Sequence, residues 1–408
     1  MTDQTNAAAP LALKPDDYEG YIKEVLCLQY NREVAEVVPL RHNNARVYSI
    51  SLTDAQQAPP AFNARFGVSA LSPDARKVIM RFSDPASMLN EKVRVQNEVA
   101  VMSLAREALK PLDPSLVPEV YGWRPFSEGV GWTLIEFKQG VPLGDKFPTL
   151  NSEEKRDVLR QIAQVFKHIQ GYNLPQSART FGGLNFGPDG SLVGGPTPIV
   201  GGGPCASLSD LYQEYFNTQI GFADKCDIVQ GWRDSDLRAR LDQLAPRFAD
   251  CADSDGNNIL FDEATNKLTA LLDYDFGHIG SQADEYFYSF PSIHGLMTPP
   301  FTGDPEEEHL RNCLLNGFTE EDAQRKSESM DWMTASIRDE EFSKAGVERP
   351  ADIQGIDDLS SVYWFIQNIS PPMFFLERWR AKATPGRIEM IKREARNNLE
   401  KNLDLWGY

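Results

Sequence analysis

Oxygen-bearing side chains gather beside two short apolar runs in the second half of the chain. Asp253 lies five residues before Asn258, which opens the first run, and Asp273 directly follows the second run, residues 268–272. Carboxylate and amide oxygens that converge from adjacent strand ends are hard ligands, the kind that Mg²⁺ prefers. A further carboxylate can accept or orient the proton of a hydroxyl group. The spacing therefore predicts a magnesium site, with Asn258 and Asp273 as ligands, next to a catalytic carboxylate, Asp253.

The acidic residues after the second run leave two candidates for the carboxylate ligand. Asp273 stands at the strand end, and Asp275 begins the tripeptide Asp-Phe-Gly, the spelling of the metal-binding segment in protein kinases. Because the strand end dictates which carboxylate enters a cleft, Asp273 is favoured, and Asp275 would support it or bind a second Mg²⁺. Asp253 and Asn258 also have a plain structural interpretation, since Asp and Asn are common in turns.

Ligands that hold Mg²⁺ against nucleotide phosphates require a cation elsewhere, paired with a glutamate on a helix. Arg81 lies in a strand signal over residues 77–82, and Glu98 lies within a helix signal over residues 90–109. Lys77 shares the strand face of Arg81, because strand side chains alternate with period two, and is the alternative cation. An ordinary surface ion pair between Arg81 and Glu98 is the competing interpretation.

The composition excludes several classes of protein. With 41 basic and 59 acidic residues the formal charge is −18, which argues against a nucleic-acid or anionic-membrane binder. No apolar run of about 18 residues predicts a membrane span, and the start of the chain lacks the pattern of a secretory signal. The five cysteines form no C-x-x-C pair and the five histidines are scattered, so a reduced cytoplasmic protein without a zinc site is expected.

The order of predicted elements gives the fold class. Amphipathic and β-rich segments predict one helix, a hairpin, three further strands and a second helix before residue 138, and helices dominate after it. We therefore expect an α+β, protein-kinase-like two-lobe fold, in which an antiparallel sheet with a helix precedes a mostly helical lobe. The expected division is a disordered N-terminus over 1–15, a nucleotide-binding N-lobe over 16–138 and a C-lobe over 139–408 that carries the catalytic loop, metal site and acceptor pocket. Residues 182–204, rich in Gly and Pro, are expected to be irregular.

Together these segments resemble the aminoglycoside phosphotransferase and choline kinase superfamily, particularly its fungal branch. Asp253 and Asn258 match the catalytic and metal-binding positions of the family motif H-G-D-x-x-x-x-N, and Leu272-Asp-Tyr-Asp275 matches its strand-terminal acidic motif. The strand with Arg81 and the helix segment Asn97-Glu98 are similar to those of the fungal members. The resemblance covers roughly residues 30–290 and implies ATP and Mg²⁺ as cofactors and a hydroxylated small molecule as acceptor.

The resemblance also implies a hinge, and it has two departures. Backbone groups near Glu136 and Lys138 would bond the adenine ring. Cys251 stands where the family has His, and Arg41-His-Asn-Asn44 replaces a glycine-rich phosphate turn. Without glycines the backbone approaches phosphate less freely, although Asn tolerates positive φ.

The expected function is an ATP- and Mg²⁺-dependent phosphotransferase acting on a small-molecule hydroxyl, with Asp253 as catalytic base. The alternative is a pseudokinase-like protein that binds a nucleotide or partner without transferring phosphate, which the two departures favour. The retained carboxylates and amide favour the enzyme.

Overall fold

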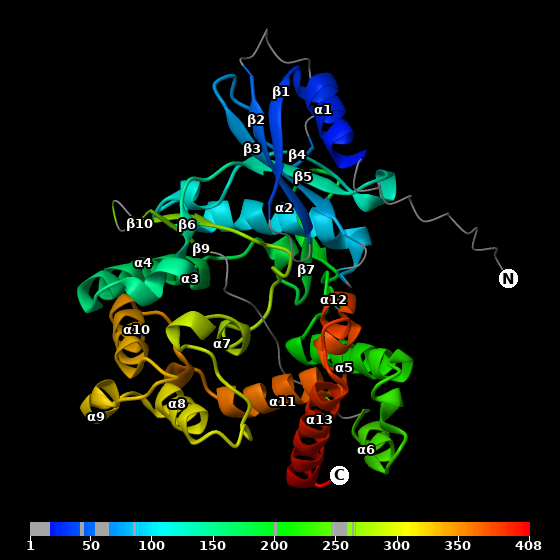
Figure 1. The fold of residues 1–408 in the computed structure, drawn as a ribbon, viewed down its shortest axis with the longest axis vertical. Helices are drawn as coiled ribbons and strands as arrows, with labels where there is room; N and C mark the ends of the chain where they lie inside the picture. The colour runs from blue at the N-terminus through cyan, green and yellow to red at the C-terminus, as the bar shows by residue number, and fades with distance from the viewer. Residues whose placement is uncertain are drawn as a thin grey trace, which may run out of the picture.

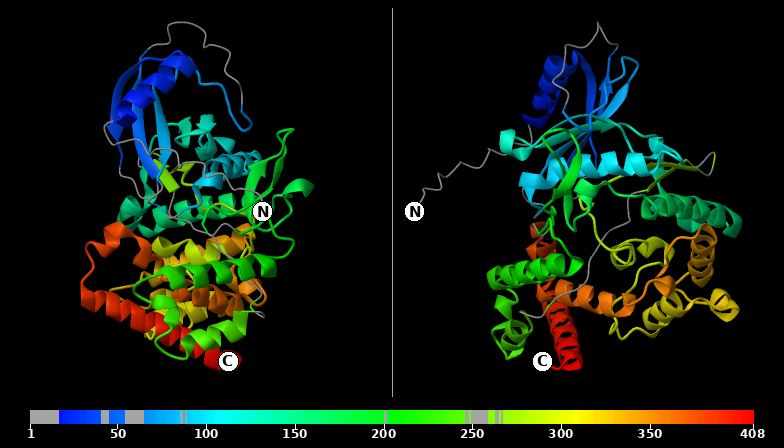
Figure 2. Two further views of the ribbon diagram at one scale, coloured as in Figure 1. Left: turned by 90° about the vertical axis from the view of Figure 1, so that its right-hand side faces the viewer. Right: turned by 180° about the vertical axis from the view of Figure 1, so that it is seen from behind.

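The computed structural model describes residues 17–408 except 41–44, 54–64, 85–86, 88, 200–201, 246–247, 249–258, 263–264 and 266. An upper region built on a β-sheet lies above a larger region made mostly of helices (Figures 1 and 2). This arrangement confirms the predicted α+β, two-lobe class. The sheet of the upper region is antiparallel with the order β1-β2-β3-β5-β4, and its strands are β1 (Val34–Pro39), β2 (Ala45–Leu52), β3 (Lys77–Ser83), β4 (Val120–Arg124) and β5 (Trp132–Glu136).

Strand alternation decides which side chains of β3 face which helix. Val78, Met80 and Phe82 are buried in an apolar cluster with α1 (Asp17–Tyr30). The odd-numbered positions therefore point to the opposite face, where Ile79 packs with residues of α2 (Glu91–Ala108). This alternation places Arg81 on the same side of the sheet as α2.

Helix α2 joins the sheet to the rest of the molecule. Its apolar residues Val95, Val99 and Met102 are buried in a core that continues into the helical region. At its start, the Asn90 N–H donates to the Pro198 carbonyl at 2.6 Å. The apolar core and this hydrogen bond therefore fix α2 in place, so the side chains on its remaining face also have fixed positions.

Two small sheets lie in the described part of the helical region. Strands β6 (Val141–Pro142), β9 (Ile259–Asp262) and β10 (Lys267–Leu271) form one, in the order β10-β9-β6, and β7 (Gly183–Phe186) pairs with β8 (Leu192–Gly195) in the other. Two apolar cores hold the surrounding helices, one of which gathers α5, α6, α11 and α13. The helices are α3 (Leu143–Lys146), α4 (Ser152–Gln170), α5 (Leu208–Lys225), α6 (Leu237–Leu244), α7 (Glu285–Tyr288), α8 (Pro305–Asn316), α9 (Glu320–Gln324), α10 (Trp332–Ala345), α11 (Ile356–Ile369), α12 (Glu377–Arg380) and α13 (Pro385–Trp406).

The expectation of an irregular segment over 182–204 was partly wrong. Residues 183–195 form the β7–β8 hairpin, which packs against α2 (Figure 1). The hairpin lacks a run of β-branched residues, and tertiary packing of Leu184 against α2 overrides its weak strand propensity. The short strand β6 was also not expected, because two residues carry no periodic signal.

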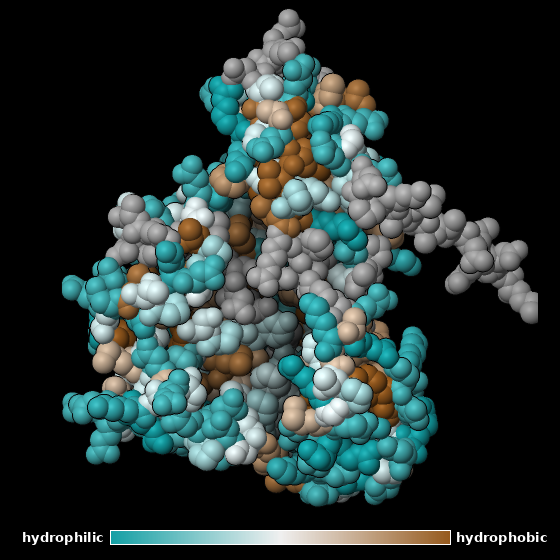
Figure 3. Space-filling model, in the orientation of Figure 1, coloured by the Kyte–Doolittle hydropathy of each residue, from teal (hydrophilic) through white to brown (hydrophobic). Residues whose placement is uncertain are grey.

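Figure 3 shows how hydrophilic and hydrophobic residues are distributed over one face of the molecule. Hydrophilic side chains cover most of the helical region in this view, and hydrophobic ones gather on the upper region. Among the described helices, none combines the length and apolar character that a bilayer crossing requires.

Candidate active site

The site begins with an ion pair between the sheet and α2. Arg81 extends from β3 and its Nη1 donates to Oε1 of Glu98. Glu98 also lies near Thr133 of β5, whose Oγ1 is 3.4 Å from Oε2. Only 4% of the Glu98 side chain and 11% of the Arg81 side chain are exposed. Since both are this deeply buried, the interpretation of an ordinary surface pair does not apply.

The same arginine reaches the strand-end carboxylates. Arg81 Nη2 donates to Asp273 Oδ1 at 2.8 Å and to Asp275 Oδ2 at 3.0 Å. The backbone of Asp273 lies in the left-handed region, with φ of 63°. This conformation is uncommon outside glycine, is tolerated best by Asp and Asn, and tends to occur at functional sites. Residues 192 positions apart in the sequence are thus brought into direct contact.

The two aspartates differ in what remains open to a ligand. Asp275 is 1% exposed, and Arg94 of α2 donates to both of its oxygens, at 3.1 Å to Oδ1 and 2.6 Å to Oδ2. Asp273 is 30% exposed and accepts from Arg81 through one oxygen only. Asp273 is therefore the more open of the two carboxylates, and Asp275 holds the two arginines in place behind it.

A bridging amide fixes the segment after Asp275 against α2. Asn97 Nδ2 donates to the Gly277 carbonyl at 2.8 Å, and its Oδ1 accepts from the Leu184 N–H of β7 at 2.7 Å. A Cβ at Gly277 would lie 2.5 Å from a methyl group of Val101, so only glycine allows this approach. The Asp-Phe-Gly segment is thereby locked to α2.

Burial and charge shift the carboxyl groups in different directions. Burial raises the pKa of Glu98 to about 7; the nearby arginines oppose this shift, and the two aspartates reinforce it. Burial also raises the pKa of Asp273, with Arg81 opposing and Asp275 reinforcing. For Asp275 burial is outweighed by the guanidinium groups of Arg81 and Arg94, which hold its pKa at about 2.

The charges of this cluster do not balance. Arg94 also pairs with Glu91 at 2.9 Å, so among the described residues the connected ion pairs comprise two arginines and four carboxylates. With every carboxyl group ionised, the formal excess is two negative charges in a largely buried place, where uncompensated charge is costly. A divalent cation beside Asp273 would neutralise this excess, and its hard oxygen is a donor that suits Mg²⁺. These residues therefore fit the predicted metal.

The other sequence-predicted residues lie apart from this cluster. Lys77 is exposed at the start of β3, with its Nζ 4.3 Å from the centre of the Phe137 ring, so it does not replace Arg81. Lys138 Nζ donates to Glu136 Oε1 at 3.1 Å. The Glu136 N–H donates to the Glu119 carbonyl at 2.8 Å, which commits this donor to the sheet. The predicted hinge contacts stay a prediction.

Asp253 and Asn258 lie outside the described residues, as do Cys251 and residues 41–44. Strand β9 begins at residue 259 and pairs with β10. The described chain therefore resumes directly after Asn258, beside the strand that leads to Asp273.

Sequence reasoning missed Arg94 and Glu91, which complete the cluster. A signal was present: Glu91, Arg94 and Glu98 recur at helical spacing and so share one face of α2. All three are buried, although charged residues at such spacing usually mark a solvent-exposed face. Nothing in the local pattern distinguishes the two cases, because the burial comes from β3 and the segment after β10.

Comparison with known proteins gives only a weak structural likeness. No protein-family model matches the chain, and no curated protein matches it significantly. Solved structures of aminoglycoside phosphotransferases are similar to it.

Three examples carry bound nucleotides. A thermostable mutant of APH(4)-Ia with ADP and hygromycin B is 15% identical, with a TM-score of 0.41 over 91% of this chain and 98% of that one. The streptomycin–ATP–APH(2″)-IIa complex is 12% identical, with a TM-score of 0.44 over 93% and 99%. The GDP complex of a mutant aminoglycoside 2′-phosphotransferase-IIIa is 14% identical, with a TM-score of 0.37 over 94% and 97%. TM-scores below 0.5 are too low to support a conclusion about fold or function. The two-lobe assignment therefore rests on the strand order and the helices of the chain itself.

Proposed function

We propose that this chain is an ATP- and Mg²⁺-dependent phosphotransferase that acts on a hydroxyl group of a small molecule. The observation that supports it best is the contact of Arg81 with both Glu98 and Asp273. Kinase-type phosphoryl transfer needs a cation held by a helix glutamate and a metal-binding carboxylate on a neighbouring segment. Here β3, α2 and the end of β10 supply these three groups at hydrogen-bonding distance.

Each described residue has a definite task under this proposal. Glu98 orients Arg81 so that the positive charge of its guanidinium group lies beside the nucleotide phosphates. Asp273 holds Mg²⁺ together with Asn258. The bound ion supplies positive charge against the phosphate oxygens. Asp275 keeps Arg81 and Arg94 fixed through three hydrogen bonds, so little reorganisation is required when the nucleotide binds.

Asp253 is the proposed base for the acceptor. The acceptor hydroxyl oxygen bonds to the terminal phosphorus of ATP, the bond from that phosphorus to the bridging oxygen breaks, and ADP leaves. The hydroxyl proton passes to Asp253. Because no covalent enzyme intermediate is needed, positioning and electrostatic stabilisation supply most of the rate enhancement.

Nucleotide binding is the first test. Thermal melting of the full chain with a non-hydrolysable ATP analogue, with and without Mg²⁺, should show a metal-dependent rise in the midpoint, because a ligand of the folded state stabilises it. Asp273→Asn should lose this rise. Asp242→Asn, at an exposed carboxylate paired with Arg238 on α6, is the matched control and should keep it. A rise of equal size in Asp273→Asn contradicts the proposed site.

Phosphate transfer is tested separately. ADP release is followed with a panel of hydroxylated small molecules, aminoglycosides among them, and product masses identify phosphate addition. With an accepted substrate, Asp253→Asn should remove most turnover and retain nucleotide binding. Nucleotide binding without transfer to any member of a broad panel would instead support the pseudokinase-like alternative.

A further inference from the structure

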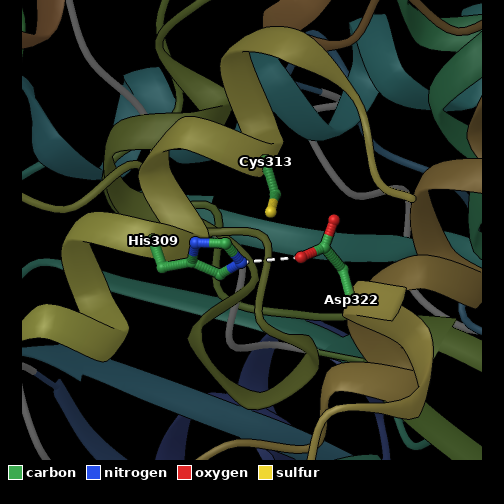
Figure 4. Close-up of side chains that lie close together, drawn as sticks. All are labelled: His309, Cys313 and Asp322. Atoms are coloured by element: carbon green, nitrogen blue, oxygen red, sulfur yellow. Dashed lines mark hydrogen bonds and ion pairs between the residues drawn. The ribbon is translucent and has the colours of Figure 1, made fainter. Parts of the chain in front are cut away.

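A second group of potential ligands lies in the helical region, away from the five-stranded sheet. His309 and Cys313 extend from α8 and Asp322 from α9, and their side chains point toward one another (Figure 4). His309 Nε2 is 2.6 Å from Asp322 Oδ1, and the ligand atoms of all three residues lie within 4.8 Å of one another. Figure 1 places α8 and α9 at the opposite end of the molecule from β3.

The donor types and their spacing suit a transition metal better than Mg²⁺. His309 and Cys313 are four residues apart on one helix, so their side chains lie on the same face one turn apart. An imidazole nitrogen, a thiolate and a carboxylate oxygen are the three donors that Zn²⁺ takes in proteins. A soft thiolate also selects against Mg²⁺ and Ca²⁺.

The surroundings hold two of these donors in place. Asp322 Oδ2 accepts from the Thr319 N–H at 2.9 Å and from Thr319 Oγ1 at 2.7 Å, in the capping box of α9, and this leaves Oδ1 directed at His309. The His309 ring packs edge-on against Trp332 at a centroid distance of 5.1 Å. Such supporting contacts orient metal ligands and raise metal affinity.

The ligand residues differ in how far their side chains are exposed to solvent. Cys313 is 2% exposed, whereas the His309 side chain is 32% exposed. A cation could therefore enter past the imidazole and meet the thiol at the base. Three protein donors leave a fourth tetrahedral position for water, on the open side.

We propose that His309, Cys313 and Asp322 form a zinc-binding site that fastens α9 to α8. On binding, the cysteine thiol releases its proton to the solvent and the thiolate bonds to the metal, while His309 binds as neutral imidazole. The ligand set then carries two negative charges, which balance Zn²⁺. The sequence gives no sign of this site, because only the turn between α8 and α9 brings Asp322 back to the face of His309.

A metal-free arrangement is the competing explanation for the same contacts. His309 and Asp322 would then form an ordinary ion pair that caps α9, beside a buried free thiol. The two explanations differ in one property, since only a metal site brings the Cys313 sulfur into a metal bond.

Cobalt(II) is the probe that reports this bond. The full chain is treated with a chelator, dialysed, and titrated with Co²⁺ under reducing conditions. A thiolate-to-cobalt charge-transfer band should grow in to one equivalent and disappear on addition of Zn²⁺. Zn²⁺ alone should raise the melting midpoint.

Substitutions test whether the metal–sulfur bond is formed by Cys313. Cys313→Ser should abolish the band, and Cys27→Ser, at an exposed cysteine of α1, should leave it unchanged. His309→Gln leaves the buried thiol intact and should weaken Co²⁺ binding by about tenfold or more, since even supporting partners of metal ligands contribute that much. Asp273→Asn should keep the band, which separates this site from the proposed magnesium site.

Two results would overturn the proposal. One is the absence of a charge-transfer band in the wild-type protein at a several-fold excess of Co²⁺. The other is a band that persists in folded Cys313→Ser or keeps its affinity in His309→Gln, with folding checked by circular dichroism.

Discussion

Two networks of ion pairs in this molecule differ in charge balance. The network around Arg81 joins β3, α2 and the end of β10, and it contains two arginines and four carboxylates among the described residues. The α4–α10 network consists, among the described residues, of a connected set and a separate pair: Arg156, Arg160 and Lys344 are connected with Asp157, Glu340 and Glu341, and Lys155 pairs with Asp331, which gives four cations and four carboxylates. The first is unbalanced and mostly buried, and the second is balanced and mostly exposed.

Under the proposed function, the Arg81 network binds a ligand and the α4–α10 network holds two helices together. A balanced network at a helix interface satisfies its own charges and contributes modestly to stability. An unbalanced buried network costs stability in the free protein, and such a cost is typical of sites that await a ligand of opposite charge. Substitutions should therefore act on stability in the α4–α10 network and on ligand binding at Asp273.

Arg94 should give the largest effect, because it supports the unbalanced network from within. Arg94→Met removes the guanidinium that bonds both oxygens of Asp275, a carboxylate that is 1% exposed. Breaking a buried pair in this way leaves an uncompensated charge, so the free energy of unfolding should fall by about 3–5 kcal/mol. Urea unfolding at pH 7 measures it. A fall below about 1 kcal/mol would mean that Arg81 alone satisfies Asp275.

Substitution of Asp273 should lower turnover without lowering the stability of the fold. Asp273→Asn removes one negative charge from the unbalanced network, so the melting midpoint without ligand should stay the same or rise. Turnover with an accepted substrate should fall about 100-fold or more, equivalent to about 2.7 kcal/mol of lost transition-state stabilisation. Steady-state kinetics and melting curves of the same preparation test both halves. Lower stability with unchanged turnover in Asp273→Asn would contradict the assignment of Asp273 as a metal ligand.

Glu341 provides the matched change in the balanced network. Its side chain is 3% exposed and accepts from Arg156 at 2.7 Å and from Lys344 at 3.1 Å. Glu341→Gln leaves these cations with an excess of positive charge, but both are partly exposed and water compensates them. We expect a loss of about 1–2 kcal/mol in unfolding free energy. Turnover and metal-dependent stabilisation should not change, and a change in either would link α10 to the site.

The sequence predicts the pair on which the unbalanced network is built, Arg81 and Glu98. It does not predict Arg94 and Glu91, which complete the network. Apolar periodicity and strand alternation place Arg81 and Glu98 on facing surfaces, because both patterns are local. The cluster with Arg94 requires the segment after β10 to lie against α2, and the Asn97 bridge to Gly277 that holds it joins residues 180 positions apart. The choice between Asp273 and Asp275 depends likewise on which carboxylate the two arginines cover, and no local spacing encodes that.

The same limit explains the elements that were not expected. The β7–β8 hairpin depends on Leu184 packing against α2, and the His309–Asp322 pair depends on the turn between two helices. Each depends on tertiary contacts between segments whose local sequence patterns are weak. By contrast the strand signal over residues 77–82 matches β3, and the helix signal over residues 90–109 matches α2, because the apolar patterns of these two segments are local.

Asp331 should give the smallest effect and the clearest dependence on pH. It caps α10, where its Oδ1 accepts from the Thr334 N–H at 3.0 Å, and its Oδ2 accepts from Lys155 of α4 at 2.6 Å. Burial alone would raise the pKa of Asp331, but the hydrogen bonds from Lys155 and Thr334 outweigh it and hold the pKa at about 2. A carboxyl group whose folded-state pKa lies below its ordinary value of 3.8 stabilises the fold above that value. The contribution is then lost as the pH falls toward 2.

Asp331→Asn tests this contribution with little change in shape, because asparagine also caps helices. The side chain is 41% exposed, so solvent screens the pair with Lys155, and we expect the variant to lose about 1 kcal/mol or less at pH 7. The difference in melting midpoint between wild type and variant should shrink as the pH is lowered from 4 to 2, and added salt at pH 7 should reduce it in the same way. A difference that is independent of both pH and salt would show that Asp331 acts only as a cap, and the balance of charge in the α4–α10 network would then contribute nothing at this position.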